Sequence, residues 1–170
     1  MPPSPTGPFR LSQADGKGAP MHRLRDLFDM PPLWLAVFAA LAWALSGLTP
    51  AIDAAWPIWL GRLLIALGLG IMLAAFWAFL RRRTTLIPRR PPSGLVDGGV
   101  YRWSRNPIYV GDLLVLAGLA VGWQSWLGLL LVPALGAVLE WRFIRREEPI
   151  LAATLGQPYR EYQARVRRWV

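Results

Sequence analysis

The sequence of 170 residues contains no cysteine, one lysine and one histidine. Without cysteine there is no disulfide, no thiolate metal site and no cysteine nucleophile, and the redox compartment stays open. His22 lies in a stretch rich in proline and glycine, where a solvated imidazole is expected. No metal site is therefore predicted. The chain also lacks a P-loop, a glycine-rich dinucleotide turn, an HExxH motif and a Ser-His-Asp set, which excludes the common enzyme classes built on them.

Apolar residues and bases are both abundant. The chain is 54% hydrophobic with ten tryptophans, and it carries 19 Lys plus Arg against 10 Asp plus Glu. Such a combination is typical of a membrane protein, in which bases collect in the loops. A basic loop can also bind nucleic acid, but the aromatic residues here fall in apolar runs and turns. The pattern favours contact with membrane lipids and no nucleic-acid partner.

Four apolar runs predict the architecture. Each is apolar all round, which indicates membrane spans rather than amphipathic surface helices. The first is short against the roughly 20 residues that a bilayer requires. We therefore predict an all-α integral membrane bundle of about four transmembrane helices plus a C-terminal amphipathic helix. The runs cover residues 33–48 (with a possible extension to 52), 58–80, 107–122 and 126–144.

The distribution of arginine predicts the topology. With four spans, the basic N-terminal stretch, the loop at 81–106 and the segment from Arg142 onward all lie on one side. The only base on the other side is Arg62, with Asp53 nearby. The positive-inside rule places the basic side in the cytoplasm, and we expect the membrane to be a bacterial inner membrane. Residues 1–29 are predicted as a disordered or surface tail. Residues 30–170 are predicted as one domain, with two spans in 30–80 and the functional half in 81–170.

Two polar clusters flank the last pair of spans. Arg105 and Asn106 precede Pro107, a residue that is well tolerated in the first turn of a helix. The free N–H groups and positive dipole end of that helix make a natural anion site. Glu147 and Glu148 follow two arginines at the far end of the next run. If the two runs form a hairpin, both clusters meet on the cytoplasmic side.

Other polar residues have more than one interpretation. Glu140 and Asp112 lie within spans, where an ionisable group indicates function or an ion pair, here with Arg105 or Arg142. Gly118 and Gly122 indicate close helix packing, and Pro149 predicts a kink.

The segment 149–170 has a helical, one-sided pattern. It predicts either a lipid-bound anchor or a lid that bends at Gly156-Gln157-Pro158. We expect the lid, with Tyr159 and Tyr162 on its inner face.

These motifs resemble the isoprenylcysteine carboxyl methyltransferase family and the related phospholipid methyltransferases. The resemblance covers roughly 84–170. It departs from the family at Asn106, where many members have histidine, at Asp112, which is usually apolar, and at Pro149. The motifs run from Thr84-Thr85 through Leu95-Val96, Gly99, Tyr101-Arg102, Ser104-Arg105-Asn106-Pro107, Tyr109 and Gly111 to Arg146-Glu147-Glu148, Leu151, Leu155-Gly156, Tyr159, Tyr162 and Arg165-Val166-Arg167-Arg168-Trp169.

The resemblance implies S-adenosylmethionine as cofactor and a lipid-like or isoprenylcysteine-type acceptor that enters from the bilayer. The catalytic residues expected from it are Glu148, Arg105 and Tyr159. The expected cofactor-binding residues are Tyr101, Arg102, Arg105, Asn106, Pro107, Tyr109, Glu147, Glu148 and Tyr162. An acid holds the cationic groups or ribose hydroxyls, Arg105 and the helix start hold the carboxylate, and aromatic rings cover the adenine or sulfonium.

Three questions remain open at this stage. A carboxylate acceptor needs no general base, whereas an amine acceptor does, with Glu148 or Tyr159 as the helper. A membrane reductase that uses NADPH is the rival enzyme, because sterol reductases look similar in this region. A non-catalytic membrane scaffold is the rival outside enzymes. The sequence does not predict the oligomeric state.

Overall fold

The computed structural model describes residues 30–48, 50–82 and 94–170, and every regular element in this part of the chain is helical. The predicted tail at 1–29 and the Thr84-Thr85 motif lie outside the described residues. The main helices are α2 (Pro31–Ser46), α3 (Trp56–Arg82), α4 (Pro107–Gly122), α5 (Leu131–Leu139), α6 (Arg145–Leu155) and α7 (Gln157–Arg165). Short 3-10 turns precede α4 at η1 (Gly99–Arg102) and α5 at η2 (Leu127–Leu130). The all-α prediction is confirmed.

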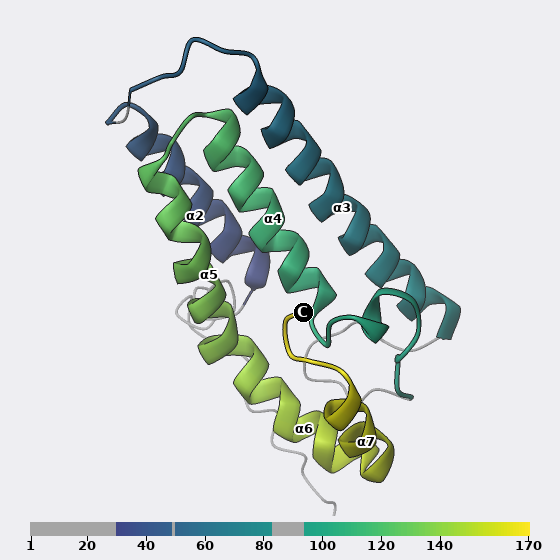
Figure 1. Ribbon diagram of the computed structural model, residues 1–170. Coiled ribbons are helices and arrows are strands. Elements are labelled where there is room, and N and C mark those ends of the chain that lie inside the picture. Colours follow the sequence, from purple (N-terminus) through teal and green to yellow (C-terminus); the bar gives the residue numbers. More distant parts are fainter. Residues whose placement is uncertain (1–29, 49, 83–93) are drawn as a thin grey trace, which may run out of the picture.

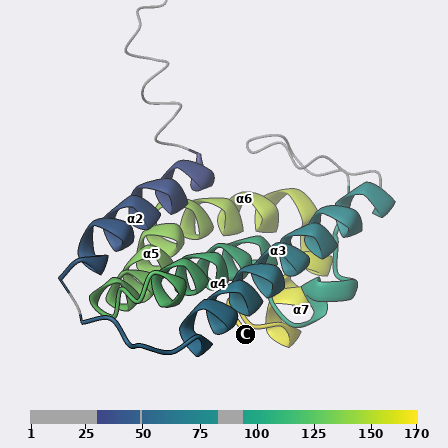
Figure 2. The same ribbon diagram turned by 90° about the horizontal axis from the view of Figure 1, so that it is seen from above.

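The helices α2 to α5 lie side by side, and α4 is the central one, in contact with α2, α3 and α5 (Figures 1 and 2). The start of α2, the end of α3 and the start of α4 lie toward one end of the bundle (Figure 1). At this end α6 continues the line of α5, and α7 turns back so that the chain ends beside the start of α4 (Figure 1). The predicted hairpin of the last two runs is therefore present.

Two helical stretches are long and apolar enough to cross a membrane, Trp56–Arg81 and Leu127–Leu155. The helices α2 and α4 are apolar but shorter. Large apolar side chains cover the outer surface of α3, including Leu63 at 55% exposure and Leu73 at 67%. In water such a surface would cost free energy, whereas lipid is its natural environment. The helices thus match the four predicted runs, and two of them have the length of a span.

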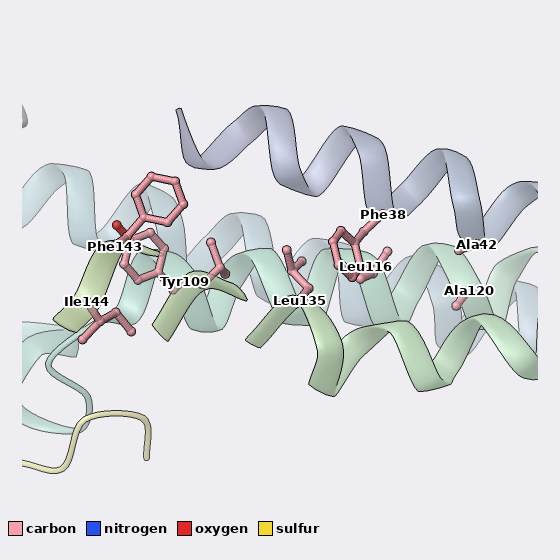
Figure 3. Close-up of a cluster of buried hydrophobic side chains, with 9 residues drawn as sticks. Phe38, Ala42, Tyr109, Leu116, Ala120, Leu135, Phe143 and Ile144 are labelled. Carbon is pink, nitrogen blue, oxygen red and sulfur yellow. The ribbon is translucent and has the colours of Figure 1, made fainter. Parts of the chain in front are cut away.

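The core lies where α4 packs against α2, against α5 and against residues 140–144, which connect α5 to α6 (Figure 3). In a bilayer these contacts stabilise the bundle through close van der Waals packing rather than through the removal of apolar surface from water. Tyr109 and Phe143, with ring centroids 6.3 Å apart, close the core at the end toward α6. The cluster consists of Phe38, Ala42, Tyr109, Leu116, Ala120, Leu135, Leu139, Phe143 and Ile144.

Glycines bring α3 and α4 into backbone contact. A β-carbon at Gly61 would lie 2.6 Å from the carbonyl oxygen of Gly118 and 2.8 Å from the backbone nitrogen of Gly122. One at Gly68 would lie 2.7 Å from the carbonyl oxygen of Gly111. No side chain fits at such distances, so hydrogen is the only substituent that this approach allows. The prediction of close packing at Gly118 and Gly122 is confirmed, and α3 is the partner.

The fourth helix differs from the prediction, which ended it at residue 144. It passes through a π-helical turn at Glu140–Ile144 and continues as α6 to Leu155. Pro149 lies within α6, where its missing N–H leaves the carbonyl of Arg145 without the usual helical donor. The break comes at Gly156, whose φ of 63° favours glycine, and α7 begins at the next residue. The predicted amphipathic helix is thus two helices, with the bend in the expected place.

Candidate functional site

The helix α4 begins at Pro107, as predicted, and the residues before it hold the C-terminal segment 166–170. The side chain of Asn106 does not cap the helix. Its Nδ2 donates to the carbonyl oxygen of Arg168 at 3.0 Å, and its backbone N–H donates to Ser104 Oγ at 3.1 Å. The backbone N–H of Arg105 donates to the carbonyl oxygen of Arg167 at 3.0 Å. The segment therefore lies against the start of α4.

Glu148 is shared by two arginines. Arg168 donates to its carboxylate from Nη2 at 2.7 Å and from Nε at 3.1 Å, a two-point contact. Arg105 contacts the same carboxylate through Nη2 alone, at 3.3 Å. The Arg105 and Glu148 side chains are only 13% and 14% exposed, so water screens this pair less than a surface ion pair. Arg105 Nε is buried and has no hydrogen-bond acceptor within the described residues.

Glu140 extends this cluster one step along the fourth helix. Its carboxylate accepts from Arg168 Nη1 at 2.9 Å, from Arg145 Nη2 at 3.2 Å and from the indole Nε1 of Trp169 at 3.1 Å. Glu140 does form ion pairs, but these are with Arg145 and Arg168, which are not the partners predicted for it. The π-helical turn that begins at Glu140 changes the rotation of the helix at this point, a distortion that is common at functional sites.

Asp112 does not form the ion pair predicted for it. It is buried at 3% exposure and makes no hydrogen bond or ion pair within the described part of the chain. It lies on the same face of α4 as Tyr109 and Leu116, the face that packs into the core. Its proposed partner Arg105 lies at the helix start and turns to Glu148 instead.

Glu147 has a different environment from its neighbour. The hydroxyl of Tyr109 donates to Glu147 Oε2 at 3.5 Å. Among the described residues no arginine forms an ion pair with Glu147. The two adjacent acids thus differ: Glu148 is paired with two arginines, and Glu147 keeps capacity to accept from a further group.

Three tyrosines pack around these charges from η1 and α7. Tyr101, Tyr159 and Tyr162 are all buried, and the Tyr162 hydroxyl donates to the carbonyl oxygen of Tyr101 at 2.7 Å. Burial raises the pKa of each above its ordinary value. The charges of Glu148 and Arg105 act on the pKa of Tyr159, which places this hydroxyl near the ion pair. The tyrosines therefore stay protonated near neutral pH and act there as hydrogen-bond donors.

Nearly all of the predicted site residues meet at this end of the bundle. One does not, since Arg102 is exposed and has no hydrogen bond or ion pair to another described residue. The residues brought together are Tyr101, Arg105, Asn106, Pro107, Tyr109, Glu147, Glu148, Tyr159 and Tyr162.

Sequence reasoning left four residues out of the site, namely Ser104, Glu140, Arg168 and Trp169. Three acids at one helix end need cationic partners. Which of the many arginines supplies them is not visible in the sequence.

Two hollows adjoin the C-terminal segment. The first, of about 730 Å³, is a largely apolar groove between α3, η1 and α4, and its lining also includes Arg81, Ser104 and Val170. Its apolar wall includes Ile71, Ala74, Trp77, Val96, Val100 and Val110. The second, of about 520 Å³, is a polar cleft along α6 and α7 that is lined by Arg145, Glu148, Gln163 and Arg168. The segment 166–170 contributes to both hollows.

Comparison with known protein families gives a match. The profile of the phospholipid methyltransferase family matches residues 56–158, from the start of α3 to the start of α7. Comparisons with curated proteins and with solved structures gave no match. The family match begins earlier than the resemblance noted in the sequence, and it ends before Tyr159. It covers well over half of the chain, which therefore belongs to the phospholipid methyltransferase family of membrane methyltransferases.

Proposed function

We propose that the protein transfers a methyl group from S-adenosylmethionine to a lipid-like acceptor that enters from the bilayer, at the cytoplasmic face of a bacterial inner membrane. The observation that carries the proposal is the buried Nε of Arg105, which has no acceptor among the described residues. A buried donor without a partner costs about 1–3 kcal/mol. The carboxylate of the cofactor would supply the missing acceptor. Bound there, the cofactor provides an electrophilic methyl group on a sulfonium.

The remaining residues fit the other parts of this cofactor. Glu147, which has no ion pair in the described chain, accepts from the ammonium or the ribose hydroxyls. Tyr109 and Tyr159 offer aromatic faces for the adenine or the sulfonium. Glu148 holds Arg105 in place through the contact at 3.3 Å. The role of the protein is alignment, which is the main requirement of an in-line displacement.

The apolar groove is the proposed acceptor site. It lies between α3, whose outer surface is exposed, and the central helix α4, and its lining includes Ser104 and Val170, which are next in the chain to Arg105 and Trp169 of the polar cluster. An amine acceptor must lose a proton before attack, and we assign that step to Glu147, because the carboxylate of Glu148 is bound by two arginines. Tyr159 is a poor base at neutral pH because burial raises the pKa of its hydroxyl. An acceptor carboxylate is already ionised and needs neither group.

Calorimetric titration of detergent-purified protein with S-adenosylhomocysteine tests the cofactor. We expect saturable binding by the wild type and a loss of 30-fold or more with Arg105→Ala. Removing one partner of a shielded charged hydrogen bond typically costs about 2–5 kcal/mol. A parallel titration with NADPH separates the reductase alternative. Binding of NADPH alone, or of neither compound, overturns the proposal.

Reporter fusions test the orientation. The arginine-poor loops are expected outside the cytoplasm, so fusions after residues 54 and 124 should both report the outer side. A cytoplasmic signal from either fusion contradicts the proposed topology, and with it the cytoplasmic active site.

A further inference from the structure

We propose that Arg168 is a positioning residue, which keeps the Nε of Arg105 free for the cofactor by saturating the carboxylate of Glu148. The inference rests on the proposed function. It concerns a residue beyond the end of the family match at 158. Its basis is the way in which two arginine side chains share the two carboxylate oxygens of Glu148.

The contacts are unequal. Arg168 binds Glu148 with two nitrogens, Nη2 at 2.7 Å from Oε2 and Nε at 3.1 Å from Oε1. Arg105 approaches only Oε1, with Nη2 at 3.3 Å. A lone arginine beside a lone carboxylate prefers the two-point arrangement that uses two guanidinium nitrogens. Arg168 already holds that arrangement, so Arg105 is limited to a single contact and its Nε has no acceptor within the described residues.

Without the guanidinium of Arg168, Glu148 would have both oxygens available to Arg105. Arg105 would then form a two-point contact, in which its Nε donates a hydrogen bond to Glu148. The cofactor carboxylate would lose the donor assigned to it above. Arg168 therefore acts through Arg105 rather than by touching the cofactor.

The C-terminal segment is built to hold Arg168 in this place. The backbone carbonyl oxygen of Arg168 accepts hydrogen bonds from Asn106 Nδ2 at 3.0 Å and from Ser104 Oγ at 3.3 Å. On the other side Nη1 contacts Glu140 at 2.9 Å, and the indole of Trp169 donates to the same carboxylate. Arg168 thus connects the loop before α4 with the fourth helix. Its pKa is raised, chiefly by the hydrogen bond to Glu148, so it stays charged.

Titration of the detergent-purified full chain with S-adenosylhomocysteine tests this role. Arg168→Ala should weaken binding at least tenfold, about 1.4 kcal/mol. Arg168→Lys should recover part of the loss, because it keeps the charge but not the two-point contact. The control is Arg160→Ala, an exposed arginine of α7, which should bind as the wild type does.

A second background separates positioning from general stability. Arg105→Lys removes the Nε but keeps a charge. In that background Arg168→Ala should change the affinity less than threefold, because the group through which it acts is gone. Equal losses in both backgrounds would show a structural role only and overturn the inference. So would wild-type affinity in Arg168→Ala or, if that variant does not fold, in Arg168→Lys. A wild type that binds no S-adenosylhomocysteine would overturn the proposed function as well.

Discussion

The seam between α3 and α4 and the polar cluster at the start of α4 lie on the same helix but are held together in opposite ways. At the seam, Gly61 and Gly118 bring two backbones together, and apolar side chains such as that of Ile65 pack beside them. At the cluster, Glu148 is bound by side chains that come from residues 105 and 168. The seam is sensitive to any added atom, and the cluster is sensitive to any lost charge.

This difference follows from the surroundings. Lipid offers no drive to bury apolar side chains against one another, so helices gain by close approach and by filling space. At the polar end, charges that are partly removed from water need partners, since an unpaired one is costly. The seam sets the position of α4, and the cluster sets the position of the side chains that the proposed reaction uses. The comparison predicts that the two regions fail separately.

The largest expected effect is on cofactor affinity, from the loss of the shared carboxylate. Glu148→Ala leaves Arg105 and Arg168 without their common partner and should weaken S-adenosylhomocysteine binding about 30- to several-thousand-fold, or roughly 2–5 kcal/mol. Glu161→Ala is the matched control, because Glu161 is exposed and its carboxylate accepts a hydrogen bond from Gln157, outside the cluster. Calorimetry on folded protein measures both. Wild-type affinity in Glu148→Ala would remove the cluster from the site.

The next effect tests the seam alone. Gly61→Ala puts a methyl group 2.6 Å from the carbonyl oxygen of Gly118, so the helices must separate. Overpacking of this kind typically costs about 1–3 kcal/mol. At Gly70, on the same helix, nothing lies within 4 Å of the added carbon. Gly70→Ala should therefore stabilise by up to about 1 kcal/mol through helix propensity.

Unfolding of bicelle-reconstituted protein by sodium dodecyl sulfate measures both glycine variants. The remaining folded fraction of Gly61→Ala should bind S-adenosylhomocysteine with wild-type affinity if the two regions are independent. A loss of affinity that parallels the loss of stability would show that the seam and the cluster are one unit.

A third test separates the groove from the cluster. Ala74 lines the apolar groove, whereas Ala66 lies on the exposed surface of α3 outside it. Ala74→Trp should reduce the rate of methyl transfer at least tenfold, about 1.4 kcal/mol, without changing cofactor affinity. Ala66→Trp should change neither. Phosphatidylethanolamine in mixed micelles and N-acetyl-S-farnesylcysteine serve as the two acceptor probes. Equal rates in both variants would place the acceptor elsewhere.

The helices could be predicted from the sequence because each has a local signal. Pro107 marks the start of α4, and the positive φ at Gly156 ends α6. The glycine pair at 118 and 122 predicted close packing, though not that Gly61 is the partner. The prediction that the charged residues after 144 end the fourth helix is wrong. Held by α7 and the C-terminal segment, they continue the helix.

The pairing of charges could not be predicted from the sequence. Arg105, Glu147 and Glu148 were predicted to meet, and they do lie at one end of the bundle. The sequence gives no means of choosing Arg168 over other arginines, because the choice depends on how a segment sixty residues away folds back onto Asn106. The same limit applies to Asp112, because one of its two expected partners, Arg105, is bound to Glu148. Local periodicity predicts elements, whereas long-range ion pairs depend on the finished packing.

The smallest effect concerns the hydrogen bond that joins α7 to η1. Tyr162→Phe removes the donor to the carbonyl oxygen of Tyr101 and should cost about 0.5–1.5 kcal/mol of stability at pH 8. Burial raises the pKa of Tyr162 in the folded state, so its stabilising contribution is complete below the ordinary pKa and is lost as the pH rises toward the folded value. At pH 11, about one unit above the ordinary pKa, the ionisation of Tyr162 in the unfolded chain should lower the free energy of unfolding of the wild type by about 1.4 kcal/mol. The phenylalanine variant has no such group at position 162 and does not lose this contribution. The two stability curves should therefore cross between pH 10 and 11. Unfolding by sodium dodecyl sulfate at pH 8, 10 and 11 measures the difference. A constant difference across this range would mean that Tyr162 ionises as readily in the folded protein as in the unfolded chain, and that α7 does not shield the cluster from water.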